Sequence, residues 1–178
     1  MEDIFYRQMP HSLEAEQSVL GSMLIDANCV KDVMEQLRPD DFYLQQNREI
    51  FETIYSMFVY SKPIDGVTVA GEMEKNGKSN EQTRSYLVQL MEVTPTSANV
   101  MEYVRIVQEK SLMRQGAFAA GRITAMVQQG TGSAGDMLEA AEQRIYAIRR
   151  GRSAQSMVPV SMVLGDVMSQ LAELSARG

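Results

Sequence analysis

The sequence contains no tryptophan, one cysteine and one histidine among its 178 residues. The single cysteine, Cys29, excludes an internal disulfide, and such low cysteine use suits a reducing compartment. No apolar run approaches the roughly 20 residues that a membrane-spanning helix needs. The N-terminus is polar and acidic, unlike a signal peptide. These absences predict a cytoplasmic protein that has no membrane segment.

Basic residues are also scarce in the first half of the chain. Residues 1–97 carry 8 Lys or Arg and 16 Asp or Glu, a net charge of −8, whereas residues 98–150 carry 7 basic and 5 acidic groups, a net charge of +2. Proteins bind a phosphate backbone through Lys and Arg, and an acidic surface repels it. The charge distribution therefore disfavours direct nucleic-acid binding by residues 1–97.

Hydrophobic residues recur at helical spacing along nearly the whole chain, and no segment has a strong strand pattern. Residues 1–97 contain several short helical segments separated by turns. The turns fall at Pro39, Ser61-Lys62-Pro63 and Thr94-Pro95. Ser12 is a good N-cap for the first helical segment. We therefore predict an all-α fold that begins with a helical head over residues 1–97.

Residues 98–150 predict an antiparallel helical hairpin. The first part contains no proline and forms one long helix, or two helices joined at Gly116 or Gly121. A glycine-rich turn over residues 129–135 precedes a return helix, which Asp136 is expected to cap. We expect its inner face to consist of Met137, Leu138, Ala141, Ile145 and Ile148. Small residues should let the two helices approach closely. These are Ala117, Ala119, Ala120, Gly121, Ala140 and Ala141. Because such hairpins usually pair, we expect self-association through this region.

The last segment, residues 151–178, reads as a linker followed by a linker helix. Residues 151–157 are small and polar, which is typical of a linker. Ser161 can cap the helix that follows, and one face of this helix is apolar. That face consists of Val163, Leu164, Val167, Met168, Leu171 and Leu174. An amphipathic helix on a tether needs a partner surface to cover such a face.

No combination of residues assembles a catalytic, cofactor or metal site. His11 is expected at the surface of a loop, and a lone histidine cannot supply a metal site. Cys29 lies on the apolar face of a helix, which predicts a buried, inert thiol. Residues 77–79 (GKS) end like a phosphate-binding loop, but five residues separate Gly71 from Gly77 where that loop has four. We predict a plain turn there.

Three acidic pairs could suggest metal binding or acid–base chemistry, and two of them have structural explanations. Glu14 and Glu16 stand two positions apart on a helix, so their side chains diverge, and both complement the positive end of the helix dipole. Asp40 and Asp41 follow Pro39 and are expected to form a cap and a turn. Glu72 and Glu74 likewise suggest no acid–base site. The sequence therefore predicts an interaction protein rather than an enzyme.

An ordered set of short motifs resembles one protein family. The motifs are residues 12–21 (SLEAEQSVLG), 40–43 (DDFY), 63–68 (PIDGVT), 85–87 (SYL), 94–99 (TPTSAN) and 103–114 (YVRIVQEKSLMR). Each motif alone is weak, but their order and spacing together resemble the N-terminal region of bacterial replicative hexameric DNA helicases, the DnaB family. The resemblance covers residues 10–150, and the linker helix extends it to residue 178.

The resemblance implies a collar of N-terminal domains, assembled from dimers to a hexamer through hairpin pairing, above a ring of motor domains. ATP and Mg²⁺ are expected only in the motor, which this chain lacks, so no cofactor is expected here. The collar is expected to bind the C-terminal domain of primase and, in some systems, the helicase loader. Glu14 and Tyr86 are family candidates for primase coupling, and Met126 is a further candidate because it lies near the hairpin tip. The apolar face of the linker helix is expected to dock on the neighbouring subunit.

Two interpretations stay open at this point. The first is a non-catalytic collar that mediates oligomerisation and primase docking during DNA replication. The second is a stand-alone helical adaptor or helicase-regulating protein that has no motor domain. An enzyme built on a helical bundle is disfavoured, because no titratable cluster supports one.

Overall fold

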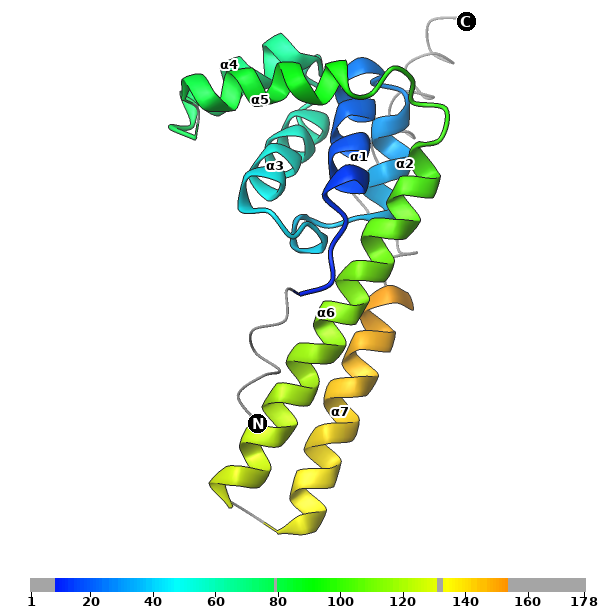
Figure 1. Ribbon diagram of the computed structural model, residues 1–178, viewed down its shortest axis with the longest axis vertical. Helices are drawn as coiled ribbons and strands as arrows, with labels where there is room; N and C mark the ends of the chain where they lie inside the picture. The colour runs from blue at the N-terminus through cyan, green and yellow to red at the C-terminus, as the bar shows by residue number, and fades with distance from the viewer. Residues whose placement is uncertain (1–8, 79, 131–132, 154–178) are drawn as a thin grey trace, which may run out of the picture.

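The computed structural model describes residues 9–78, 80–130 and 133–153. These residues form seven α-helices and one 3₁₀ turn, with no strand among them, which confirms the all-α prediction. The elements are α1 (Leu13–Ile25), α2 (Cys29–Gln36), η2 (Pro39–Asp41), α3 (Gln45–Val59), α4 (Gly66–Lys75), α5 (Glu81–Glu92), α6 (Val100–Gln129) and α7 (Ala134–Ser153). Helices α1–α5 gather around one end of α6, and α6 and α7 form a hairpin that extends away from them (Figure 1).

The core of the head surrounds α1, which packs against α3, α5 and α6. Ser12 caps this helix as predicted, because its hydroxyl accepts a hydrogen bond from the amide of Ala15 at 3.3 Å. Several apolar side chains of the head have no exposed surface. They include Val19, Leu20, Met23, Val30, Val33, Leu37, Phe42, Ile50, Phe51, Ile54, Val69 and Leu90. Each buried Val, Leu, Ile, Phe or Met contributes about 1.5–3 kcal/mol relative to an exposed one.

The contact between α1 and α5 depends on Gly21. A Cβ at this position would overlap the carbonyl oxygen of Leu90 and the side chain of Thr94. Glycine alone allows the two helices to come this close, because it has no side chain. The close approach fixes α5 against α1 and so positions Tyr86, which lies one turn before Leu90.

The Gly77-Lys78 segment ends α4. Gly77 has a φ of 68°, a left-handed conformation that glycine adopts readily. The amide of Lys78 donates to the carbonyl oxygen of Met73 at 2.9 Å and satisfies a group at the end of the helix. The segment is therefore a helix-terminating turn, as predicted.

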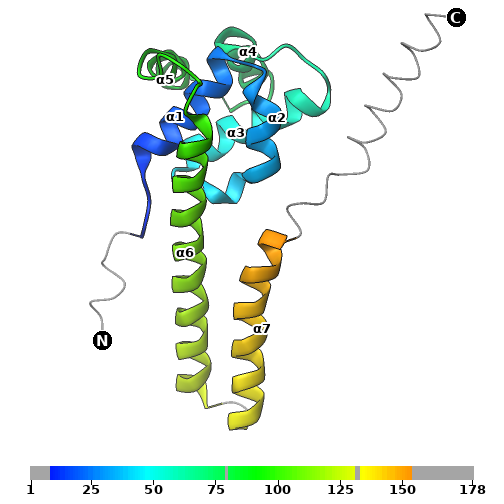
Figure 2. The same cartoon turned by 90° about the vertical axis from the view of Figure 1, so that its right-hand side faces the viewer.

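Helix α6 runs without interruption for 30 residues, so neither Gly116 nor Gly121 divides it. Figure 2 shows α7 antiparallel to α6, and α6 is the helix that continues into the head. Helix α7 extends to Ser153, three residues beyond the predicted end of the hairpin. Of the described helices, none combines the length and hydrophobicity needed to cross a membrane.

The predicted cap of α7 was wrong by three residues. The hydroxyl of Ser133 accepts a hydrogen bond from the amide of Asp136 at 3.2 Å. The carboxylate of Asp136 accepts one from the amide of Ser133 at 2.9 Å. Ser133 is therefore the N-cap, and Asp136 completes a capping box from the first turn of the helix.

The predicted inner face of α7 was wrong at two of its five positions. Leu138 and Ile145 are more than half exposed, whereas Met137, Ala141 and Ile148 are half-buried. Leu138 and Ile145 each stand one position after a half-buried residue, which turns them about 100° away from α6. The apolar residues of α7 thus occupy two neighbouring sides of the helix, and only one of them faces α6.

The small residues of the hairpin do not all serve close packing. Ala117 and Ala120 are exposed, and a Cβ at Gly121 would have no atom within 4 Å. Ala119, Ala140 and Ala141 are half-buried. The expectation of a close approach therefore fails at Gly121, where the helix surface is open.

Candidate interaction surfaces of the head and the hairpin

Glu16 is a buried carboxylate of α1 that binds the segment leading into α3. It is 1% exposed, and its carboxylate accepts hydrogen bonds from the amide of Tyr43 at 2.7 Å and from Nδ2 of Asn47 at 2.8 Å. The amide of Leu44, the N-cap residue of α3, lies 3.5 Å from the same carboxylate. Glu16 therefore fixes the turn that leads into α3 and the side chain of Asn47 in the first turn of that helix, although it accepts from none of the free amides of α3 itself. The expectation that Glu16 only complements the dipole of α1 missed this role.

Tyr86 joins this network at the surface of the head. Its hydroxyl donates to Oδ1 of Asn47 at 2.8 Å and accepts from Nε2 of Gln17 at 3.4 Å. The Tyr86 hydroxyl carries its proton at neutral pH, as tyrosine ordinarily does, and burial raises its pKa further. The side chain is half-buried. Tyr86 therefore links α1, α3 and α5 and still presents part of its surface to a partner.

An open groove of about 760 Å³ lies beside Tyr86, between the start of α3 and α5. Polar side chains dominate its lining. They include Gln45, Gln46, Gln82, Ser85, Tyr86 and Gln89. Carboxamides and hydroxyls both donate and accept hydrogen bonds, which suits recognition of a polar protein surface. Among the residues that the structure describes, no three His, Cys, Asp or Glu side chains gather closely enough to hold a metal ion.

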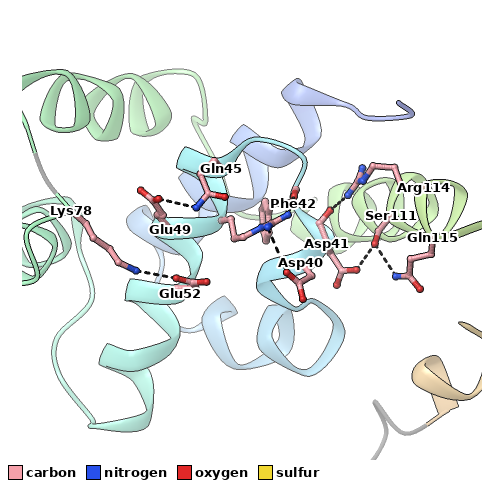
Figure 3. A network of polar contacts seen from close by, with 11 residues as sticks. Asp40, Asp41, Phe42, Gln45, Glu49, Glu52, Lys78, Ser111, Arg114 and Gln115 are labelled. Atoms are coloured by element: carbon pink, nitrogen blue, oxygen red, sulfur yellow. Dashed lines mark hydrogen bonds and ion pairs between the residues drawn. The ribbon is translucent and has the colours of Figure 1, made fainter. Parts of the chain in front are cut away.

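A second polar cluster joins α6 to the head (Figure 3). The hydroxyl of Ser111 donates to Oδ1 of Asp41 at 2.6 Å. The guanidinium of Arg114 donates to the carbonyl oxygen of Asp41 and to that of Pro10, the latter at 2.8 Å. Arg114 is 7% exposed, and its burial lowers the pKa of the guanidinium. Asp41 thus does more than cap a turn, because it also fixes the orientation of the hairpin relative to the head.

His11 lies on the loop before α1 and packs one face of its ring against the head. Its ring stacks on Tyr43 with the ring centroids 4.2 Å apart, and its Nδ1 lies 2.7 Å from the carbonyl oxygen of Met9. The guanidinium of Arg114 lies 5.8 Å from the centroid of the same Tyr43 ring. His11 thus lies on a partly exposed loop as predicted, and its stacking on Tyr43 is a contact that the sequence did not reveal.

Cys29 is buried, as predicted. Burial raises the pKa of the thiol to about 11, so the thiol is neutral at physiological pH. Its Sγ donates to the carbonyl oxygen of Asp26 at 3.1 Å. The side chain is therefore an inert part of the core.

The predicted site residues fall on two separate parts of the molecule. Glu14 is exposed in the first turn of α1, one turn before Gln17, which contacts Tyr86. Met126 is half-buried near the far end of α6 and is not part of this group. The six residues assigned to docking of the linker helix, from Val163 to Leu174, lie outside the described residues.

The hairpin carries a wide apolar face that sequence reasoning missed. It consists of Ile106, Met113 and Val127 on α6 and Leu138 and Ile145 on α7, which are between 38% and 58% exposed. We call this set the apolar face of the hairpin. Spacings of seven and fourteen residues place each set on one side of its helix. The signal that identifies them is this heptad spacing.

The two rows of the apolar face lie on the same side of the hairpin. On α6, Met113 and Val127 each follow a half-buried residue, Leu112 and Met126. On α7, Leu138 follows half-buried Met137 in the same way. On each helix, the exposed row therefore lies about 100° around the helix axis from the half-buried residues that face the other helix. The rotation has the same sense when it is followed along either sequence. In an antiparallel pair, equal rotations bring both rows to one side.

The arrangement defines a class of protein: an all-helical domain in which a compact head continues into a long hairpin through one shared helix. A solved structure with this architecture is the N-terminal domain of DnaB helicase from Mycobacterium tuberculosis, which is 35% identical and aligns with a TM-score of 0.73. That alignment covers 79% of this chain and 99% of the other. The family model described as "DnaB-like helicase N terminal domain" matches residues 8–109. The chain belongs to this family, which confirms the resemblance found in the motifs.

Full-length relatives are replicative helicases. "Replicative DNA helicase DnaB" of Leifsonia xyli subsp. xyli is 36% identical over 156 residues, which cover 87% of this chain and 34% of that protein. The protein of the same name from Mycobacterium leprae is 33% identical over 177 residues, which cover 98% of this chain and 29% of that protein. The chain thus spans about a third of the length of these curated relatives.

The fold extends to a more distant structure. The N-terminal domain of DnaB helicase from Helicobacter pylori is 24% identical and aligns with a TM-score of 0.57. The alignment covers 65% of this chain and 90% of the other. That structure is described together with its interactions with primase. At this identity the likeness concerns the fold alone.

Proposed function

We propose that this chain is the non-catalytic collar of a hexameric replicative DNA helicase, and that it mediates oligomerisation and docks primase during DNA replication. ATP and Mg²⁺ would then be bound by a motor domain outside this sequence. The observation that carries the proposal is the apolar face of the hairpin. An exposed apolar surface with heptad spacing is typical of helices that pair with other helices.

The occupant of the apolar face is a second copy of the chain. The five exposed side chains lie on two helices of the same hairpin, so two copies can present identical surfaces to one another across a twofold axis. The face also lies about 140° around α6 from the row that packs against the head. The head therefore does not obstruct pairing, and further contacts between pairs would build the hexamer.

Sedimentation of the purified chain tests this pairing. The double variant Met113→Lys/Leu138→Lys places charges on the apolar face, and we expect it to sediment as a monomer at concentrations where the original chain is dimeric or larger. Val67→Lys is the matched control, because Val67 is exposed on α4 in the head. A monomeric original chain, or a double variant that still self-associates, would contradict the proposal.

The surface around Tyr86 is the proposed docking site for the C-terminal domain of primase. The polar groove offers hydrogen-bonding groups, and exposed Glu14 lies one turn from Gln17 on α1. The description of the Helicobacter pylori domain with primase adds support from a protein of the same fold. The acidic head favours a protein partner over DNA, because residues 1–97 carry a net charge of −8.

Titration with the cognate primase C-terminal domain tests the docking site. Tyr86→Phe removes one hydroxyl and Glu14→Gln removes one charge, and we expect each to raise Kd by about tenfold, which is about 1.4 kcal/mol. Met126→Ala tests the contribution of the hairpin tip, and Val67→Ala serves as the control. An unchanged Kd in all three variants would refute the assignment. We propose a helicase loader as a second partner, and its Kd for the same variants can be measured in the same way.

The apolar face of the linker helix completes the proposal. Its residues, Val163, Leu164, Val167, Met168, Leu171 and Leu174, would dock on the motor of the neighbouring subunit. The amphipathic pattern supports this role, because a tethered helix with one apolar face needs a surface to cover it. In a full-length helicase that contains this chain, Leu171→Asp is expected to weaken ring assembly, and an unaltered hexamer would count against the docking.

A further inference from the structure

Asn76 follows the last residue of α4 and is the only asparagine in the sequence that precedes a glycine. It is the C-cap residue of the helix, and it is exposed. Gly77 is exposed as well, and a Cβ built on it would have no atom within 4 Å. The side-chain amide of an asparagine can react with the backbone nitrogen of the next residue, and a glycine there places no side chain in the way. Asn76 and Gly77 thus meet the steric requirement for this reaction.

The other four asparagines of the chain lack this combination. Asn47 is buried in the network of the head. The side chains of Asn28 and Asn80 form hydrogen bonds with neighbouring residues. Asn99 precedes Val100, whose branched side chain shields the backbone nitrogen. Sequence and structure together therefore single out Asn76.

The folded turn restrains the reaction without blocking it. The Asn76 ψ of 4° places the Gly77 nitrogen beside the Asn76 nitrogen instead of beside Cβ, so this bond must rotate before a ring can close. The amide of Gly77 also donates to the carbonyl oxygen of Glu74 at 3.0 Å. Both restraints belong to the exposed end of a helix, which opens at little cost in free energy. The reaction therefore proceeds from a locally opened turn while the rest of the head stays folded.

We propose that Asn76 is a site of spontaneous deamidation, and that the isoaspartate formed there loosens the turn that carries Lys78. The nitrogen of Gly77 attacks Cγ of Asn76 and forms a C–N bond. The side-chain nitrogen leaves as ammonia, together with the proton of the Gly77 amide, and a succinimide ring results. Water then opens the ring at either carbonyl group, which gives aspartate or isoaspartate. No oxidant or reductant takes part, and the reaction does not depend on the proposed docking of primase.

Isoaspartate changes the path of the main chain at this turn. The turn is closed by a hydrogen bond from the amide of Lys78 to the carbonyl oxygen of Met73 at 2.9 Å. In isoaspartate the main chain runs through the former side chain, which adds a methylene inside the closed turn and displaces this bond. Lys78 also reaches Oε2 of Glu52 on α3 at 3.0 Å (Figure 3) and lines the polar groove. Isoaspartate thus loosens one wall of the groove, whereas aspartate only adds a carboxylate between Lys75 and Lys78.

Ageing of the purified 178-residue chain at mildly alkaline pH tests the site. Cleavage after glutamate releases residues 75–81, a peptide that contains both Asn76 and Asn80. Its fragmentation should place the mass gain of an amide converted to an acid on Asn76, which should react at least about tenfold faster than Asn80. Isoaspartyl methyltransferase should methylate the same peptide. Asn76→Gln should abolish both signals, because glutamine closes the corresponding larger ring far more slowly.

Three results would overturn the assignment of the site. One is an equal rate of conversion at Asn76 and Asn80. The second is methylation of the peptide that survives Asn76→Gln. The third is an intact Asn76 in the folded chain after a time in which the denatured chain converts.

Amide exchange tests the consequence for the turn. In the isoaspartate form, separated by chromatography, the Lys78 amide should exchange faster by on the order of tenfold, because its bond to Met73 is displaced. Asn76→Asp is the matched control, because it adds the carboxylate without lengthening the main chain and should keep the protection. Unchanged protection of Lys78 in the isoaspartate form, or an equal loss in Asn76→Asp, would refute the loosening of the turn by isoaspartate.

Discussion

The head encloses an apolar core, whereas most of the large apolar side chains in the outer part of the hairpin are partly or largely exposed. In the head, Leu20 and its neighbours have no exposed surface, and polar groups such as Glu16 are buried with their partners. In the hairpin, Leu138 and Ile145 are more than half exposed. The head therefore has a core of its own, whereas the outer part of the hairpin consists of two helices with apolar surface that another molecule can cover. Matched substitutions in the two regions measure this difference.

The largest single loss of stability is expected at Leu20, which we compare with Leu138. Leu20→Ala should lower the free energy of unfolding by about 3 kcal/mol, because it leaves a cavity in the core of the head. Leu138→Ala should change it by less than about 0.5 kcal/mol in the monomer, because its side chain is already in water. Urea unfolding followed by circular dichroism measures both. An equal loss in the free energy of unfolding for both variants would contradict the difference between a buried and an exposed leucine.

The next largest single loss is expected at Gly21, which we compare with Gly121. Gly21→Ala should destabilise the chain by about 2–3 kcal/mol, because the new Cβ overlaps the carbonyl oxygen of Leu90. Gly121→Ala should instead stabilise it by about 0.5–1 kcal/mol, because the new Cβ meets open space and alanine favours the helix. The midpoints of urea denaturation should shift in opposite directions. A shift in the same direction would show that the hairpin is packed more tightly than described.

Two glutamates two positions apart on α1 sharpen the description of the head. Glu16→Ala should cost about 2 kcal/mol, because it leaves the amide of Tyr43 and the side chain of Asn47 without their buried acceptor. Glu14→Ala should change stability by less than about 0.5 kcal/mol, because Glu14 is exposed. Thermal or urea unfolding provides the measurement. A large effect of Glu14→Ala would place this residue in the core network.

The smallest expected effect concerns the start of α7. Hydrogen bonds from the amide and the hydroxyl of Ser133 hold the pKa of Asp136 below its ordinary value of 3.8. A carboxyl whose pKa is lower in the folded state stabilises that state above its unfolded pKa, and this contribution is lost as the pH falls through the folded value.

Amide exchange in the first turn of α7 should therefore accelerate as the pH approaches that range, beyond the change caused by intrinsic exchange. Asp136→Asn should abolish this dependence. The cap of α1 should show none of it, because the hydroxyl of Ser12 does not titrate there. A first turn of α7 with pH-independent protection would contradict the capping box.

Helical periodicity and capping rules predicted much of the head, including Ser12 and the ends of several helices. They could not predict the direction of each face in the hairpin. Met137 and Leu138 are both apolar and adjacent, so the pattern shows that α7 has an apolar side but not which row faces α6. Packing decided this, since only one row can contact α6.

The candidate site was less predictable than the fold. Tyr86 was selected through a family motif, while its partners Asn47 and Gln17 lie 39 and 69 residues away in the sequence. Glu16 was interpreted locally, although its partners are 27–31 residues distant. The spacing of residues within one helix carries no information about hydrogen-bond partners that come from a segment distant in the sequence. Both the network and the groove therefore appeared only in three dimensions.

The unbroken course of α6 has a mechanical consequence. Arg114 lies at the edge of the head. The 15 residues that follow it, up to Gln129 at the end of the helix, form a rod about 22 Å long. A tilt of about 10° at Arg114 would carry the far end sideways by about 4 Å, since the rise per residue fixes the lever arm. A partner that tilts the head by a small angle relative to α6 would thus produce a larger displacement at the tip of the hairpin.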